Sequence, residues 1–177
     1  YASAGRAIAV TDNAYDTNIK GFVTGTNTLR YVAVDYVGNV SEVVERTIKV
    51  DQTAPVVAEL ASTETNRTSF SSTTSMGKTN NVDLYFTVTD ADSGLKITSS
   101  TSDNTTTYSI GEVIKATVNE MEISSSTTTY GSLSVESVSG SVYTIKLTLN
   151  ASVLAGGDTL ILANGSSYAV SVTLTDV

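Results

Sequence analysis

The sequence predicts an all-β protein of antiparallel strands, and three observations carry this prediction. Apolar and polar residues alternate strictly over several short segments, which is the pattern of a strand with one buried face. Ser and Thr make up 53 of the 177 residues, and together with Val, Ile and Tyr they favour a pleated sheet. No stretch of helical length places apolar residues three and four positions apart. Several short strands separated by turn residues indicate a sandwich or a barrel.

The clearest strands alternate through residues 29–34, 84–89, 142–149 and 170–175. Weaker strands are predicted at 6–11, 42–50, 55–61, 94–98, 112–118, 131–138 and 159–163, which gives about eleven in all. Clusters of Gly, Asn, Asp, Ser and Thr separate these segments, as expected of turns. One helical turn is predicted at 151–155, with Asn150 as its N-cap.

Three of the strands end in the same way. Residues 29–35, 84–90 and 170–176 each run apolar-x-apolar-x-apolar-x-Asp, which indicates repeated use of one strand-end corner. The only proline, Pro55, follows the polar segment Asp51-Gln52-Thr53-Ala54 between two apolar strands. Proline fixes its own φ and biases Ala54 toward an extended backbone. A domain junction is therefore predicted at 51–55.

The segment TNTLRYVAVDYVGNVSEVVERTIKVDQTAP resembles the last strands and the linker of bacterial Ig-like tandem repeats. In those repeats an alternating strand enters a D-x-x-G-N corner, here Asp35 to Asn39, and one more strand leads to a D-x-T-A-P linker, here Asp51 to Pro55. NNVDLYFTVTDADSGLKI is similar to an early strand and corner of the next repeat, and SSYAVSVTLTDV to its penultimate strand. The resemblance covers residues 27–61 closely, and 80–97 and 167–177 in part.

This resemblance implies Ig-like antiparallel β-sandwiches in tandem. Residues 1–54 would supply the C-terminal strands of one domain, and 55–177 a second, enlarged domain without its last strand. Because an Ig domain has about 100 residues, residues 99–140 would hold an insertion or extra strands. On this division the sequence starts and ends partway through a repeat, and three interpretations of that remain open. The chain is an excerpt of a longer repeat protein, or the strand at 42–50 (or all of 1–54) completes a neighbouring subunit, or 1–54 folds onto 55–177 as one larger β domain.

The composition excludes several function classes. With no His and no Cys, the chain has no Ser-His-Asp or Cys-His nucleophile system and no zinc site of the usual kind. The net charge of −8, from 10 basic and 18 acidic residues, argues against a nucleic-acid partner. No apolar run is long enough to cross a membrane. The expectation is that the protein is not an enzyme, because nothing in the sequence places two carboxylates in a cleft as a glycosidase needs.

The sequence suggests no required cofactor, and Ca²⁺ is the candidate ion. Asp90 and Asp92 form a D-x-D at a strand end, and Asp35, Asn39 and Asp51 could form a site where a corner meets its linker. The alternative is that an Asp at a strand end caps a turn through its own backbone. Two N-x-S/T asparagines in Ser/Thr-rich stretches, Asn66 and Asn104, are the candidate glycosylation sites.

The resemblance implies a structural module of an extracellular cell-surface assembly, such as a surface layer, a filament or an adhesin stalk. Its partners would be neighbouring copies or adjacent repeats of the same protein. One alternative is a filament subunit that polymerises by strand donation. Another is an adhesion module that binds a glycan or a protein through the loops of 99–130, where an exposed cluster of Tyr108 and Tyr130 would favour binding. The Ser/Thr-rich runs are expected to face solvent.

Overall fold

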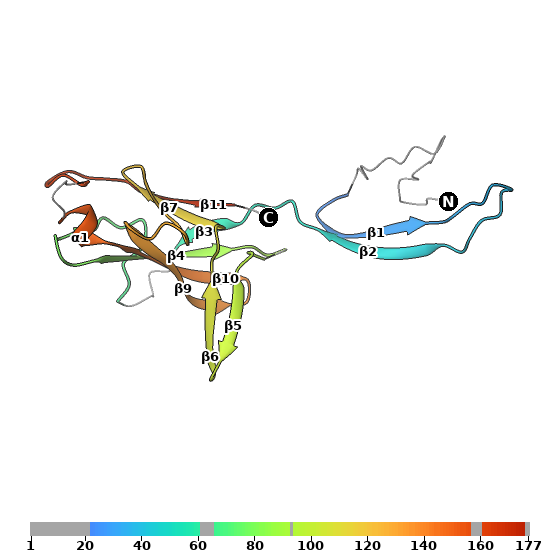
Figure 1. Cartoon of the computed structure of the whole chain (residues 1–177), viewed down its shortest axis with the longest axis horizontal. Coiled ribbons are helices and arrows are strands. Elements are labelled where there is room, and N and C mark those ends of the chain that lie inside the picture. Colours follow the sequence, from blue (N-terminus) through green and yellow to red (C-terminus); the bar gives the residue numbers. More distant parts are fainter. Residues whose placement is uncertain (1–21, 61–65, 93, 157–160, 176–177) are drawn as a thin grey trace. The chain divides into compact units, whose positions relative to one another are not determined.

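The computed structural model describes residues 22–60, 66–92, 94–156 and 161–175. This part of the chain is all-β, with eleven strands and one short helix (Figure 1). The predicted strand at 6–11, Asp176 and Ser93 lie outside the described residues. The chain divides into two compact units, residues 1–53 and 54–177. The division falls inside the segment 51–55 where the sequence predicts a junction.

The described part of the first unit is a two-stranded antiparallel hairpin, with β1 at Gly25–Tyr31 and β2 at Val44–Val50. Beyond the pair Tyr31–Val44, a bridge joins Val34 to Val40, with two residues between these pairs on one strand and three on the other. The extra residue is a β-bulge just before the turn. β1 therefore ends at Tyr31, and Asp35 follows the isolated bridge instead of the strand itself.

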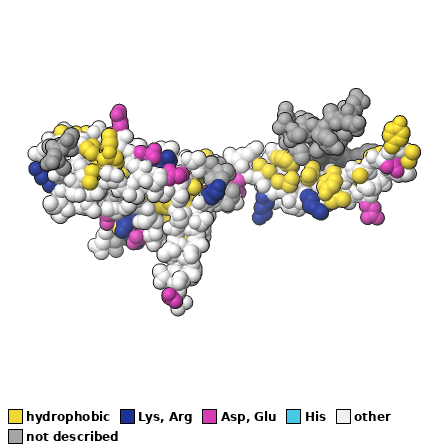
Figure 2. Space-filling view, in the orientation of Figure 1, with side chains coloured by type: hydrophobic (Ala, Val, Ile, Leu, Met, Phe, Trp, Pro, Cys, Tyr) yellow, Lys and Arg dark blue, Asp and Glu magenta, His cyan; other side chains and the backbone are white. Residues whose placement is uncertain are grey.

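The hairpin has one apolar and one polar face, because paired residues share a face and alternate along each strand. Thr26, Thr28 and Arg30 lie on the polar face with their partners in β2, and Arg30 Nε is 2.7 Å from Glu45 Oε1. The opposite face carries Leu29, Tyr31, Val44, Ile48 and Val50, with Arg46 across from Leu29 and Asn27 across from Ile48. No residue from 22 to 50 is buried. Figure 2 shows hydrophobic side chains exposed along this unit.

The second unit contains two larger antiparallel sheets. The first has the order β3-β4-β10-β9 and the second the order β11-β7-β8. The strands of the first sheet are β3 (Val56–Glu59), β4 (Val82–Thr89), β9 (Gly131–Ser139) and β10 (Val142–Leu149). Those of the second are β7 (Ile114–Val118), β8 (Met121–Ile123) and β11 (Val170–Leu174). Asp90 directly follows β4, as its sequence pattern predicts.

One hydrophobic core joins the two sheets. β4 alternates buried residues with exposed or half-buried ones along its whole length, so that Leu84, Phe86 and Val88 enter the core while their neighbours do not. The rest of the core comes mainly from β7, β8 and β10, including Ile114, Ala116, Val118, Ile123, Ile145 and Leu147. At about 25 cal/mol per Å² of buried apolar area, such residues supply the main stabilising term of this unit.

The helix α1 (Ala151–Leu154) is the predicted helical turn, and its buried Leu154 closes one end of the core. Asn150 occupies the N-cap position with an extended backbone but makes no side-chain cap bond. Its amide instead donates to the Thr129 carbonyl at 3.2 Å, and the Ala151 N–H is accepted by Asn81 Oδ1 at 3.1 Å. The helix start is therefore held by a residue that precedes β4 and not by its own N-cap.

Several predicted strands differ from those observed. The strand predicted at 94–98 is wrong for residues 94–97, where Gly94 has a φ of +74° and the buried Leu95 fills the core from an irregular segment, and only Thr98 lies in a strand. Residues 161–163, the described part of another expected strand, form no strand because Ile161 and Leu162 pack against the core, and Leu162 N–H bonds to Leu154. The hairpin of β5 (Thr98–Ser102) and β6 (Thr105–Ser109) and the short β8 were not predicted.

Candidate functional site

The Asp35 corner is a closed hydrogen-bonded turn at the tip of the first hairpin. Oδ1 of Asp35 accepts from the N–H groups of Val37 at 3.0 Å and Asn39 at 2.8 Å, and Oδ2 accepts from the Asn39 side-chain amide at 2.8 Å. Gly38, with a φ of +92°, permits the tight return. The Asn39 side chain first, and then the backbone N–H of Asn39, lower the pKa of Asp35. Both carboxylate oxygens thus serve the turn, as the capping alternative predicts.

Asp51 lies at the opposite end of this hairpin. It follows β2 directly, and its Oδ1 accepts from the Thr53 N–H at 2.8 Å. At roughly 3.3 Å per residue, β2 alone separates it from the turn by about 20 Å. Within the first unit, the structure therefore does not bring Asp51 together with Asp35 and Asn39 as ligands of one ion.

The D-x-D pair forms a second turn, after β4. Asp90 is buried, and its Oδ1 accepts from the Asp92 N–H at 3.2 Å, while Asp92 itself is exposed. Across 22–60, 66–92, 94–156 and 161–175, no three acidic side chains gather in a group that could hold a metal ion. The calcium sites remain predictions.

Asn66 and Asn104 are both exposed and both lie in turns with a positive φ, of 65° and 60°. Asp103 precedes Asn104 with a φ of 48°, so these two residues form the type I′ turn of the β5–β6 hairpin. The positions suit asparagine, which tolerates the left-handed region better than most residues. Glycosylation at either residue remains a prediction.

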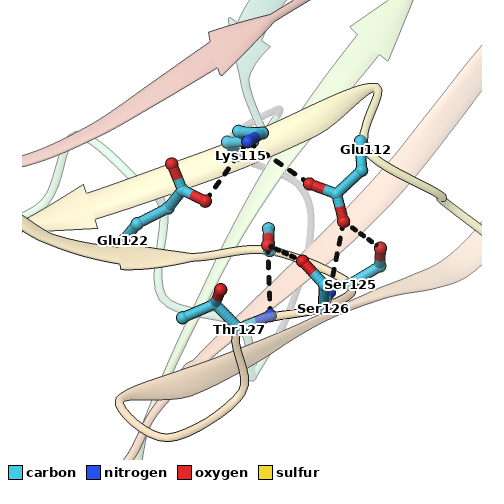
Figure 3. Close-up of polar contacts among 7 residues, drawn as sticks. Glu112, Lys115, Glu122, Ser125, Ser126 and Thr127 are labelled. Carbon is cyan, nitrogen blue, oxygen red and sulfur yellow. Dashed lines mark hydrogen bonds and ion pairs between the residues drawn. The ribbon is translucent and has the colours of Figure 1, made fainter.

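A polar cluster that the sequence did not predict lies on the outer face of β7 and β8 (Figure 3). Glu112 Oε1 accepts from the Ser125 hydroxyl at 2.6 Å and the Ser126 N–H at 3.2 Å. Lys115 Nζ lies 3.3 Å from Glu112 Oε2 and 3.2 Å from Glu122 Oε1. The lysine therefore bridges the two carboxylates.

These contacts change how the groups titrate. The hydrogen bonds from Ser125 and then Ser126 lower the pKa of Glu112 to about 2. The bonds to Glu122 and Glu112 raise the pKa of Lys115. Ser124 is fully buried beside this cluster, and its hydroxyl accepts from the Thr127 N–H at 3.2 Å. The cluster ties the 124–127 turn to the start of β7, which is a structural use of charge.

A shallow hollow of about 390 Å³ lies beside the same cluster, between Lys96, Glu112 and Thr175. Glu112 is the one acidic residue among those lining it, and its oxygens are held as described above. Tyr108 and Tyr130 do not form an exposed pair, because both are half-buried and Tyr130 packs against the core.

The free edge of the second sheet is the remaining feature of this unit. β11 pairs with β7 on one side, and no described strand pairs with the other side.

In the part of the chain that the structure describes, no helical segment has the length and apolarity of a membrane span. Comparison of the chain with protein-family models, curated proteins and solved structures gives no match.

Proposed function

We propose that this chain is a structural, non-catalytic module of an extracellular surface assembly, built from Ig-like domains in tandem. The observation that supports it best is the strand order of the second unit. β3-β4-β10-β9 corresponds to strands A-B-E-D of an Ig-like sandwich, and β11-β7 to strands F and C, with β8 added beside C. A strand order shared across two sheets is a more specific feature than strand content.

The departures from an ordinary Ig-like domain also have a place in this scheme. The β5–β6 hairpin is an insertion between strands B and C, and α1 lies in the connection from E to F. Together they account for the enlarged size of the second unit. Strand G is then the one strand without a counterpart among the described residues of 54–177.

The first unit supplies the argument for tandem domains. The sequence of β1 alternates as that of β11 does, and an Asp follows at the corresponding sequence position in each case, Asp35 and Asp176. β2 returns beside β1 as strand G returns beside strand F. The apolar face formed by Leu29, Tyr31, Val44 and Ile48 is what the F and G strands of a sandwich turn toward its core. The hairpin is accordingly assigned to the end of a preceding Ig-like domain.

The role of such a module is mechanical. Antiparallel ladders hold each unit, and the segment 51–55 connects them through Pro55 and the Asp51–Thr53 turn. The carboxylates of Asp35, Asp90 and Glu112 each hold a turn in place, and this use of charge suits a scaffold.

Antibodies raised against the purified chain test the location and role. Intact cells that produce the protein should be labelled along their surface, and gentle shearing should release labelled assemblies. A cytoplasmic protein serves as the control and must be labelled only after permeabilisation. Labelling of the chain that likewise requires permeabilisation would contradict the proposal.

A further inference from the structure

A polar hollow of about 340 Å³ lies beside the first residues of β4. Its floor comes from Asn81, which directly precedes the strand, and from Asp83 and Tyr85. These residues are two positions apart along an extended backbone, so their side chains point to the same side. That side is the outer one, because the residues that alternate with them in β4 are buried in the core.

The wall of the hollow comes from the connection between β3 and β4. This segment is fixed to the strand, since Tyr85 N–H donates to the Thr68 carbonyl at 3.0 Å. Thr68, Thr74 and Ser75 line the hollow with hydroxyl groups, and Asn66 adds an amide. The lining is therefore rich in uncharged groups that can both donate and accept hydrogen bonds.

Two residues of the floor are held in place with one polar atom each to spare. Asn81 Oδ1 accepts from the Ala151 N–H at 3.1 Å, which orients the amide. Asp83 Oδ1 accepts from the Thr148 hydroxyl at 2.7 Å. Among the described residues, nothing bonds to Asn81 Nδ2 or to Asp83 Oδ2. The floor thus presents one oriented donor and one oriented acceptor, on residues about 7 Å apart along the chain.

Tyr85 supplies the apolar part of the floor. The Arg67 guanidinium lies over its ring, with Cζ 5.2 Å from the ring centroid, and an Arg67 nitrogen lies 3.7 Å from Glu136 Oε1. These contacts hold the ring in one position. Tyr85 is only half-buried, so part of its ring remains available to a ligand. An aromatic ring beside hydrogen-bonding groups suits a ligand with an apolar face and a polar edge.

The chemistry of the lining selects the class of ligand. Asp83 is the one charged residue among the described residues that line the hollow, so it repels an anion. A Ca²⁺ ion takes about six to eight oxygen ligands, commonly from several carboxylates, and a single carboxylate is present. An apolar ligand would leave the amides and the carboxylate without hydrogen-bond partners. A neutral ligand that carries several hydroxyl groups satisfies the donor, the acceptor and the ring together.

We propose that this hollow binds a neutral saccharide. One sugar hydroxyl donates to Asp83 Oδ2, a neighbouring sugar oxygen accepts from Asn81 Nδ2, and a C–H face of the sugar ring packs against Tyr85. The volume lies at the low end of the roughly 300–1,000 Å³ of small-molecule sites, which limits the ligand to one or two sugar rings. The site adds a binding function to the structural role and does not depend on that role.

The saccharide has two potential sources. One is a glycan of another molecule. The other is this chain itself, because Asn66 lines the hollow and is a predicted N-glycosylation site, so that the first sugar on its side chain would lie at the rim. Both sources present the same chemistry to Asn81, Asp83 and Tyr85.

Amide NMR spectra of the isotope-labelled full chain, made in a host that adds no glycans, test the proposal. Glucose, galactose, mannose and N-acetylglucosamine are each added to about 50 mM, because a small open hollow predicts a Kd of about 1–10 mM. At least one sugar should produce saturating shifts at the amides of Thr68, Ser75 and Asp83. The uronate of the same sugar should bind at least about threefold more weakly at equal ionic strength, because Asp83 repels its carboxylate.

Two variants locate the site. Asp83→Ala removes the spare acceptor from an exposed side chain and should raise the Kd at least about tenfold. Ser134→Ala is the matched control, because Ser134 is exposed on the same outer face of the sheet, in one row with Tyr85 and Lys146, but outside the hollow. This variant should bind as the wild type does. Unchanged resonances of the core residues show that each variant is folded.

Three outcomes would overturn the proposal. The first is the absence of a saturating shift with any of the four sugars. The others are shifts centred away from the hollow, and an unchanged Kd for Asp83→Ala. Surface labelling of cells tests the structural role separately, so either proposal can fail while the other stands.

The chain glycosylated at Asn66 then identifies the source of the saccharide. If its own glycan fills the hollow, the added sugar no longer binds and the first sugar shows NMR contacts to the Tyr85 ring. If the glycosylated chain binds the added sugar as before, the ligand is a glycan of another molecule. Asn66→Gln, produced in the same glycosylating host, is the control for both results.

Discussion

Gly131 is the position where one added methyl group should do the most damage. It is buried at the start of β9, opposite Leu149, where β9 approaches β8. A Cβ at this position would overlap the backbone carbonyl oxygen of Thr148 and lie 2.9 Å from Ile123 Cδ1. The carbonyl belongs to the paired strand and cannot move alone, so Gly131→Ala must shift the strands apart.

Overpacking of this kind costs about 1–3 kcal/mol, and we expect about 2–3 kcal/mol because the obstacle is backbone. The unit 54–177 has 124 residues, so at about 2.1 cal/mol/K per residue its unfolding entropy is roughly 0.26 kcal/mol/K. The melting temperature should then fall by about 8–12 °C. Differential scanning calorimetry of the full chain measures this change.

Gly77→Ala is the matched control, because a Cβ there has no atom within 4 Å and its φ is not positive. Its effect should stay within about 1 kcal/mol, with either no change or a small gain from reduced freedom of the unfolded chain. An unchanged melting temperature for Gly131→Ala, with Gly77→Ala also unchanged, would refute the packing of β9 against β8 and β10.

Four further predictions concern the polar features. Lowering of the Glu112 pKa from 4.5 to about 2 stabilises the fold above pH 4.5, and this contribution is lost as pH falls to about 2. The melting temperature of Glu112→Gln should therefore differ from wild type at pH 6 and converge with it near pH 2; a constant difference would contradict this. Ser124→Ala leaves the Thr127 N–H without its acceptor and should lower the unfolding free energy by about 1–3 kcal/mol in urea titration. Asp35→Ala should speed hydrogen exchange at the amides of Val37 and Asn39, because the Asp35 carboxylate accepts from both. A chelator added to the wild-type chain should leave exchange at these amides unchanged. Protection that depends on calcium would instead support a calcium site at Asp35. In a host that glycosylates N-x-S/T sites, intact mass should show glycans removed by Asn66→Gln or Asn104→Gln, since both side chains are exposed.

The strands that could be predicted from sequence are those with one face in the core. β4, β7, β10 and β11 alternate because one face of each packs into the core, as in β4, where Phe86 is buried while Tyr85 and Thr87 on either side are only half-buried. The β5–β6 hairpin has no such requirement. All five residues of β5 are exposed, so its Ser and Thr side chains carry no alternation and read equally well as loop or strand.

The candidate sites divide in a similar way. The turns at Asp35 and Asp90 could be predicted, because an Asp bonds the backbone two residues on without tertiary contacts. The Glu112 cluster could not, since it needs β8 beside β7 and a turn that returns Ser125 to Glu112. The sequence motif groups Asp51 with Asp35, but β2 lies between them as an extended strand and separates them by its length. A sequence motif does not give this distance in space.

The β5–β6 hairpin has a practical consequence. Its strands are held by their own ladder, its tip is the exposed Asp103–Asn104 turn, and Figure 1 shows it projecting from the second unit. Such tips tolerate inserted sequence, because nothing beneath them depends on their side chains. An epitope or a fluorophore-binding peptide grafted between these two residues would be displayed to solvent while the core of β4, β7 and β10 is left intact. The β5–β6 hairpin is therefore a ready attachment point for labels on whatever assembly the protein forms.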